Sequence, residues 1–295
     1  MKMYYHLDCD GKTSGHIIHD AILKGKIVLS GEEPSPEYIK ITYADPFPLA
    51  TIQPNETVYI LDYSIKPEEM KALFAITQDV VWIDHHETAI KAYEGFPTQI
   101  RGLREAGRAG CVLTYMYVWG CDYEEVPEYI RFIGDRDVWK FEYGDRTRDF
   151  CAGIQLLDLS PTSTDWTKIP MVVNHWCEIG KNVNQYKNIV NSLFIRSWSF
   201  ETVFEGYKCL AVNGRPEPES FEKMKEKYDI CIAFIFDGSV WQISFYSKTV
   251  DVGVIAKRLG EKHGTSGGGH RSAAGAIVPE LPFKKISAQM PETQK

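Results

Sequence analysis

Asp84, His85 and His86 follow directly after an apolar run, residues 80–83, which is typical of a buried strand. A carboxylate and two imidazoles are costly to bury unless they are paired or bind a metal ion. Two earlier apolar runs also lead into carboxylates. Together, the three runs predict one metal-dependent active site.

The earliest of these runs, residues 3–7, contains His6 and is followed by Asp8 and Asp10. These are three potential metal ligands at alternating positions. In extended geometry, residues two apart share a face, so these side chains are expected to converge on one or two cations. A surface turn is the alternative interpretation, because Asp10-Gly11 is a type of pair that is common in turns.

Asp62 follows the next such run, residues 58–61, and by itself it would be interpreted as a helix cap or a turn residue. The carboxyl ends of parallel strands lie at one edge of a sheet, where ligands bind. Because three predicted strands bring carboxylates or imidazoles to that edge, a shared metal site is the better interpretation. Oxygen ligands mixed with imidazole suit Mn²⁺ best, with Mg²⁺, Co²⁺ or Zn²⁺ as alternatives.

Two further acidic segments follow predicted elements. Asp135 and Asp137 flank Arg136 after a helix predicted over residues 126–133, and either a metal ligand or a surface ion-pair cluster fits this pattern. Asp45 also ends a predicted strand, but a proline follows it, and we interpret Asp45 as a turn residue.

Residues 264–272 contain three consecutive glycines followed by His270 and Arg271. Backbone N–H groups of a glycine-rich segment can approach an anion, and the two side chains add donors and charge. The segment has neither the Gly-Lys-Ser/Thr ending of a Walker A loop nor the Gly-x-Gly-x-x-Gly spacing of a dinucleotide site. We predict phosphate or carboxylate binding, with a flexible loop as the alternative.

Short β-rich runs alternate with helix-like stretches in the first part of the chain, which predicts an α/β domain with a mostly parallel sheet. Residues 171–195 predict a long connecting helix, and residues 147–169 have no regular pattern. The predicted strands are 3–7, 38–43, 58–61, 80–83, 208–212, 230–236, 241–246 and 276–278, and the predicted helices are 14–24, 67–74, 110–119, 126–133, 171–195 and 252–259. The predicted parts are a catalytic domain over 1–170, a connector helix over 171–197, a smaller α/β substrate-binding domain over 198–283 and a solvated tail over 284–295.

Composition limits the class of protein. The 295 residues are 44% hydrophobic and 25% charged, as in an ordinary globular protein, and the net charge of −7 argues against bulk electrostatic binding of long duplex DNA. The seven cysteines form no Cys-x-x-Cys pair, so reduced thiols are expected rather than a disulfide framework or structural zinc. Neither an apolar signal stretch nor a membrane-length run occurs, so we expect a cytoplasmic protein without a membrane partner.

With these motifs the chain resembles the DHH phosphoesterase superfamily, whose name comes from the Asp-His-His motif found here at residues 84–86. The superfamily includes RecJ-type exonucleases, oligoribonucleases, nucleotide phosphatases and cyclic-dinucleotide phosphodiesterases. The resemblance extends from about residue 4 to residue 278 and includes a DHH-associated C-terminal domain. The other matching motifs are His6-x-Asp8-x-Asp10-Gly11, Asp62, Asp135 and Gly267-Gly268-Gly269-His270.

The resemblance implies two divalent cations and a substrate bound between the two domains. Asp62 would bridge the cations, Asp84 would orient its neighbours, and His86 would face the phosphoryl group. Asp135 is preferred over Asp137 as the fourth-motif ligand. The implied metal ligands are His6, Asp8, Asp10, Asp62, His85 and Asp135, and the implied substrate-binding residues are Gly267, Gly268, Gly269, His270, Arg271 and Lys248.

The expected activity is hydrolysis of phosphodiester bonds in short single-stranded oligonucleotides, and both a monomer and a homodimer are consistent with it. A nucleotide phosphatase for bisphosphates such as pAp, a cyclic-dinucleotide phosphodiesterase and a non-catalytic nucleotide sensor are the alternatives. Many members have a Ser-x-Arg-Ser strand, whereas residues 244–248 here lack the arginine and offer only Lys248. Trp241, Phe245 and Tyr246 are candidates for stacking on bases or for the core of the sheet.

Overall fold

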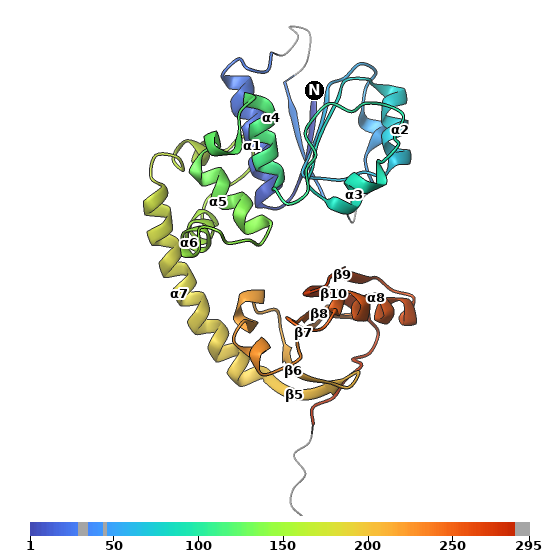
Figure 1. The fold of residues 1–295 in the computed structure, drawn as a ribbon, viewed down its shortest axis with the longest axis vertical. Coiled ribbons are helices and arrows are strands. Elements are labelled where there is room, and N and C mark those ends of the chain that lie inside the picture. The colour runs from blue at the N-terminus through green and yellow to red at the C-terminus, as the bar shows by residue number, and fades with distance from the viewer. Residues whose placement is uncertain (29–34, 44–45, 287–295) are drawn as a thin grey trace, which may run out of the picture. The chain divides into compact units, whose positions relative to one another are not determined.

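The computed structural model describes residues 1–28, 35–43 and 46–286, so Asp45 and the end of the predicted tail lie outside the described residues. The chain divides into two compact units, Met1–Asn184 and Gln185–Lys295, and each is described by itself (Figure 1). All seven cysteines are free thiols. None of the helices in the described ranges combines the length and the apolar character that crossing a membrane requires.

The first unit contains a four-stranded parallel sheet in the order β2-β1-β3-β4. Every residue of β3 and β4 is buried, because a parallel sheet is covered on both faces. All four strands therefore end at the same edge. This sheet confirms the predicted fold class. The strands are β1 (Lys2–His6), β2 (Glu37–Ile41), β3 (Val58–Leu61) and β4 (Val80–Ile83).

Alternate strand residues contribute to two hydrophobic cores, one on each face of this sheet. Leu61 and Ile83 pack with Leu113 of α4, whereas Ile60 and Trp82 pack on the other face. Helices α1 and α4 lie on the first side, and α2 and α3 lie on the second (Figure 1). The helices of this unit are α1 (Cys9–Leu23), α2 (Pro67–Ile76), α3 (Glu87–Ala92), α4 (Gly110–Trp119), α5 (Glu128–Asp137) and α6 (Asp145–Ile154), with 3₁₀ turns at Leu49–Thr51, Tyr123–Glu125 and Thr164–Thr167.

Two elements of the first unit differ from the prediction. Helix α1 begins at Cys9 instead of residue 14, because the Asp8 carboxylate accepts a hydrogen bond from the Gly11 amide at 2.9 Å and caps the helix. Asp10 is thus on a helix and not on an extended strand, so the alternating-face argument for the first motif was wrong. Residues 147–154, expected to be irregular, form most of α6.

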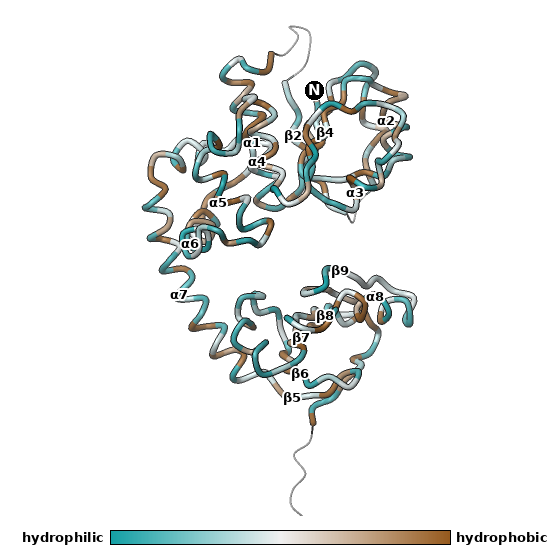
Figure 2. The backbone as a smooth tube through the Cα atoms, viewed as in Figure 1, coloured by the Kyte–Doolittle hydropathy of each residue, from teal (hydrophilic) through white to brown (hydrophobic). Residues whose placement is uncertain are grey.

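The long helix predicted over residues 171–195 is α7 (Val173–Trp198), and the two units meet within it. Hydrophilic and hydrophobic residues alternate along this helix (Figure 2). Its first half packs closely on α6 through glycines. A Cβ atom at Gly180 would lie 1.6 Å from the carbonyl oxygen of Asp149, and one at Gly153 would lie 2.1 Å from that of Trp176.

The second unit is a six-stranded mixed sheet in the order β5-β6-β7-β8-β10-β9, in which β6 and β7 are parallel and the other neighbours are antiparallel. Helix α8 (Val252–His263) packs Ile255, Ala256 and Leu259 into the core of this sheet. The strands are β5 (Ser199–Phe204), β6 (Tyr207–Asn213), β7 (Ile230–Phe236), β8 (Trp241–Tyr246), β9 (Gly267–His270) and β10 (Ala273–Val278), with 3₁₀ turns at Pro218–Phe221 and Met224–Glu226.

Replacing Gly180 by alanine is expected to destabilise the first unit. Alanine has a higher intrinsic helix propensity than glycine, so any loss of stability reports the clash with the Asp149 carbonyl. We expect Gly180→Ala to lower the free energy of unfolding by about 1–3 kcal/mol or more. Urea denaturation followed by circular dichroism measures this change. The exposed neighbour Lys181 provides the control, and equal stabilities of Gly180→Ala and Lys181→Ala would contradict the close helix contact.

Candidate metal centre

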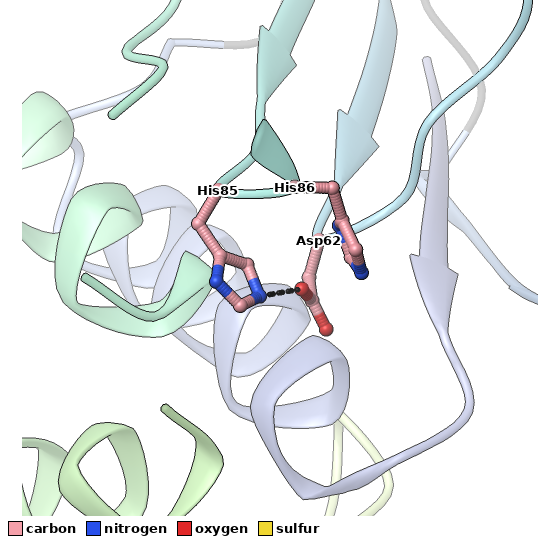
Figure 3. Close-up of side chains that lie close together, drawn as sticks. All are labelled: Asp62, His85 and His86. Atoms are coloured by element: carbon pink, nitrogen blue, oxygen red, sulfur yellow. Dashed lines mark ion pairs between the residues drawn. The ribbon is translucent and has the colours of Figure 1, made fainter. Parts of the chain in front are cut away.

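Polar side chains from three strand ends meet at the carboxyl edge of the first sheet. His6 is the last residue of β1, Asp62 follows β3 directly, and Asp84 follows β4. Asp62 lies beside His85 and His86, as the sequence predicted from the shared edge of a parallel sheet (Figure 3).

Asp62 is the most strained and the least satisfied of these residues. Its φ of 52° is in the left-handed region, which costs a residue with a Cβ about 1–2 kcal/mol. The residue is 1% exposed, and its carboxylate oxygens have ion-pair contacts with His85 and His6 but no hydrogen-bond partner among the described residues. Burial raises the pKa of this carboxyl to about 7. A buried carboxylate in this state is arranged to receive a cation.

His6 and Asp8 lie on one side of Asp62. The His6 Nδ1 atom is 2.6 Å from Asp8 Oδ2 and 3.7 Å from Asp62 Oδ2. The ligand atoms of the three residues all lie within 4.8 Å of one another. Interaction with Asp62 first and with Asp8 second raises the pKa of His6 to about 10. Without a metal, a proton on His6 thus partly offsets the negative charge.

His85, Asp10 and Asp137 form a second group on the other side of Asp62. The His85 Nε2 atom is 3.1 Å from Asp62 Oδ1, 3.3 Å from Asp137 Oδ2 and 3.8 Å from Asp10 Oδ2. Burial raises the pKa of Asp10 and that of Asp137 to about 8, each also raised by a neighbouring aspartate. The Asp62 carboxylate therefore lies close enough to both groups to contribute a potential metal ligand to each.

Asp10 reaches this group because helix α4 begins beside it. The amides of Gly110 and Cys111 donate hydrogen bonds to the Asp10 carboxylate at 2.7 and 2.8 Å, as anions commonly bind at helix N-termini. A Cβ atom at Gly110 would lie 2.8 Å from Asp62 Cβ, so glycine permits this approach. Sequence reasoning missed Gly110, although its place at the start of an apolar helix without a capping side chain was visible.

Asp84 holds the two histidines that follow it. Its Oδ1 accepts hydrogen bonds from the His85 amide at 2.8 Å and from His86 Nδ1 at 2.6 Å, and its Oδ2 accepts one from the Ser64 hydroxyl. Asp84 is fully buried, and its hydrogen bond raises the pKa of His86. These contacts fix the His86 imidazole and the backbone of His85, as carboxylates behind metal-binding histidines do. Ser64 was not recognised from the sequence.

The structure does not bring Asp135 into this cluster. Asp135 Oδ1 accepts a hydrogen bond from the Glu142 amide at 2.8 Å, and its Oδ2 accepts one from the Tyr143 amide at 3.3 Å and one from the Thr147 hydroxyl. Asp137 faces His85 instead. The expectation placed both acids after the helix, but α5 extends to Asp137, and residues two apart on a helix point to nearly opposite sides.

The glycine-rich segment of the second unit is β9 and not a flexible loop. A Cβ atom at Gly267 would lie 2.1 Å from the Ala256 carbonyl oxygen of α8, and one at Gly269 would lie 2.7 Å from Ala274 Cα in β10. Packing therefore accounts for two of the three glycines. At Gly268, whose φ is 153°, a Cβ atom would meet nothing within 4 Å, so this backbone is open to a ligand.

The basic residues predicted to bind substrate lie on the surface of the second unit. Arg271 Nη1 is 3.7 Å from Asp251 Oδ2, Lys248 Nζ is 3.6 Å from Glu222 Oε2, and His270 is exposed. Their role remains a prediction.

The three aromatic residues of β8 pack against other side chains of the second unit. Phe245 is fully buried, and Trp241 packs on Phe234 with ring centroids 5.8 Å apart. Tyr246 stacks on Phe221 at 5.4 Å. The core interpretation therefore accounts for all three better than base stacking does.

Comparison with known proteins identifies a domain at the C-terminal end and one curated relative. The model of the DHHA1 domain matches residues 219–293. A curated relative, the uncharacterized protein R106 of Acanthamoeba polyphaga mimivirus, is 23% identical over 247 residues, which cover 79% of this chain. The match covers 56% of that relative, so the chain spans about half of its length.

Solved structures with the same fold cover nearly the whole chain. The DHH domain of a member of a family of ribosomal proteins has a TM-score of 0.55 at 16% identity, with 94% of this chain and 82% of that chain covered. RecJ of Thermus thermophilus in complex with Mn²⁺ has a TM-score of 0.52 at 13% identity, with 94% of this chain and 49% of that chain covered. The pGpG-specific phosphodiesterase PggH of Vibrio has a TM-score of 0.50 at 10% identity, with 94% of this chain and 93% of that chain covered.

Two findings define what the chain is similar to. It has the fold of solved DHH-domain structures, and residues 219–293 match the DHHA1 domain.

Manganese is expected to stabilise the protein more strongly at about pH 8 than at about pH 6. The pKa values of Asp62 and Asp10 are raised to about 7 and about 8, above the usual value near 4, so both carboxyls favour the fold when protonated. Their contribution to the stability of the fold is complete below the ordinary pKa of an aspartate. It is lost as the pH rises through the pKa that each carboxyl has in the folded protein. Metal competes with these protons, so its binding strengthens over the same interval.

Thermal unfolding in EDTA and in excess MnCl₂, followed across this pH range, measures the effect. We expect Asp62→Asn to abolish the manganese shift and to raise the Tm of the metal-free protein at the higher pH, because the variant removes a carboxylate whose ionised form is disfavoured by burial. Asp20→Asn, on the same helix as Asp10 but outside the cluster, is the matched control and should retain the shift. An equal manganese shift in both variants would contradict the assignment of Asp62.

Proposed function

We propose that this protein is a two-metal phosphodiesterase that hydrolyses short single-stranded oligonucleotides. The observation that carries the proposal is the buried carboxylate of Asp62, which has no hydrogen-bond partner among the described residues and lies between two groups of potential ligands. Such an arrangement is too costly to maintain for packing alone.

The donors fit hard or borderline divalent cations. His6, Asp8 and Asp62 would hold one cation, and Asp10, Asp62, His85 and Asp137 would hold the other. Carboxylate oxygens and imidazole nitrogens without a thiolate suit Mn²⁺, with Mg²⁺ or Co²⁺ as alternatives. When bound, the pair would supply Lewis acidity that lowers the pKa of water and stabilises charge on the phosphoryl oxygens.

His86 and Asp84 provide the proton chemistry of the proposal. In hydrolysis a water oxygen bonds to phosphorus, the bond from phosphorus to the leaving oxygen breaks, and that oxygen gains a proton. The hydrogen bond to Asp84 raises the pKa of His86, which favours the protonated imidazole. His86 is proposed to donate a hydrogen bond to a phosphoryl oxygen or its proton to the leaving oxygen, and the proton that the attacking water gives up restores the imidazolium. Asp84 keeps the imidazole in its orientation.

The DHHA1 match supports a nucleotide-like substrate, and two solved structures with this fold bear the names of RecJ and of a pGpG-specific phosphodiesterase. In the second unit, the open backbone at Gly268 is proposed to bind a substrate phosphate. The other residues proposed to contact the substrate there are Gly267, Gly269, His270, Arg271 and Lys248.

Manganese-dependent product release from a substrate panel tests the function. The panel contains end-labelled RNA and DNA from dinucleotides to about twenty nucleotides, pAp and cyclic dinucleotides. We expect hydrolysis of the short linear oligomers, loss of activity in Asp62→Asn and full activity in Asp20→Asn. Asp84→Ala is expected to lower kcat roughly 10- to 100-fold, because its neighbours lose their orientation.

The other outcomes assign the site differently. Turnover only of pAp indicates a nucleotide phosphatase, and turnover only of cyclic dinucleotides indicates a cyclic-dinucleotide phosphodiesterase. Bound metal and nucleotide without any turnover would contradict the enzyme proposal and favour a sensor.

A further inference from the structure

A cavity of about 520 Å³ lies beside the metal centre, within the first unit. Its volume falls in the range of small-ligand sites, which are mostly apolar with a few polar groups. Asp8, Asp10 and Asp137 of the metal centre form part of its wall. Beyond them, the wall includes apolar side chains of Ile133, Leu157 and Leu159, and the polar or aromatic ones of Lys12, Arg136 and Trp139.

Trp139 is an unusual residue in this wall. It comes two positions after Asp137, its side chain is 49% exposed, and its φ of 57° is in the left-handed region. A bulky aromatic residue adopts this backbone only with strain, and exposure to water gives it no compensating burial. Strained residues of this kind cluster at ligand sites.

The segment that presents Trp139 is fixed from behind by Asp135. The buried Asp135 carboxylate accepts the amides of Glu142 and Tyr143, so the turn after α5 is tied to the helix itself. The Trp139 ring is braced edge-on by Phe141, with centroids 5.0 Å apart. The residue that sequence reasoning took for a metal ligand thus positions an aromatic wall of the neighbouring cavity.

Two basic residues, Lys12 and Arg136, lie among four aspartates in the cavity wall. Lys12 lies in the first turn of α1, and the Arg136 guanidinium lies over the Trp139 ring, 5.8 Å from its centroid. Both line the cavity together with the acids of the metal centre. Asp158, a further acid in the wall, is engaged by the amide and hydroxyl of Ser160. An aromatic face, an apolar wall and basic groups together match a planar base joined to a phosphate.

We propose that this cavity binds the nucleoside adjacent to the scissile phosphate, with its base stacked on Trp139 and its further phosphate near Lys12. The proposal rests on the proposed function for the bond that is cleaved. Every base has a π face, so stacking of this kind distinguishes substrates with a base from those without one and tolerates all four bases.

The test compares a dinucleotide with its abasic analogue as substrates. Trp139→Ala is expected to raise KM for the dinucleotide roughly 5- to 150-fold and to leave KM for the abasic analogue unchanged. Trp139→Gly accommodates the left-handed backbone, so it should be at least as stable as the wild type and still lose the same binding. Trp198→Ala, which removes a tryptophan 60% exposed at the end of α7, is the matched control.

A binding measurement separates this inference from the proposed function. A dinucleotide that contains 2-aminopurine and a non-hydrolysable methylenephosphonate linkage loses fluorescence when its base stacks. Quenching by the wild type and not by Trp139→Gly supports the cavity even if no substrate is turned over. Equal quenching by both proteins, or an equal rise in KM for the abasic analogue, would overturn it while leaving oligonucleotide hydrolysis standing.

Discussion

The cost of burying the Asp62 carboxylate constrains the whole first unit. A parallel sheet brings three strand ends to one edge, and the left-handed backbone at Asp62 turns its side chain into the space between them. Gly110 allows a helix to begin beside it, and that helix binds Asp10 through its first amides. Each of these features is unfavourable or unnecessary in a protein without a cation there, and together they support the proposed site for two cations.

The two aspartates in the last turn of α5 point in nearly opposite directions and have different partners. Asp137 faces His85, whereas Asp135 turns inward and binds the backbone of the following segment. The same short stretch therefore contributes Asp137 to the candidate metal centre and fixes Trp139 beside it. This arrangement couples the proposed chemistry to the proposed recognition of a base through rigid backbone contacts.

Much of the fold was predictable from sequence, because the strands at residues 58–61 and 80–83 are apolar runs ended sharply by polar residues. Because parallel strands end at one edge of a sheet, the sequence also predicted that Asp62 and the two histidines lie close together. The errors came from phase and capping. Asp8 caps α1 early, and α5 extends past Asp135, so linear spacing assigned the wrong geometry to both motifs. The strain at Trp139 depends on tertiary contacts that no periodicity reveals.

We propose that two divalent cations bind on either side of Asp62. Crystals grown with MnCl₂ and measured at the manganese absorption edge test it most directly, because anomalous density locates each ion. We expect two peaks that share Asp62, one against His6 and Asp8 and the other against His85 and Asp137. Absence of peaks at Asp62, or a peak coordinated by Asp135, would contradict it.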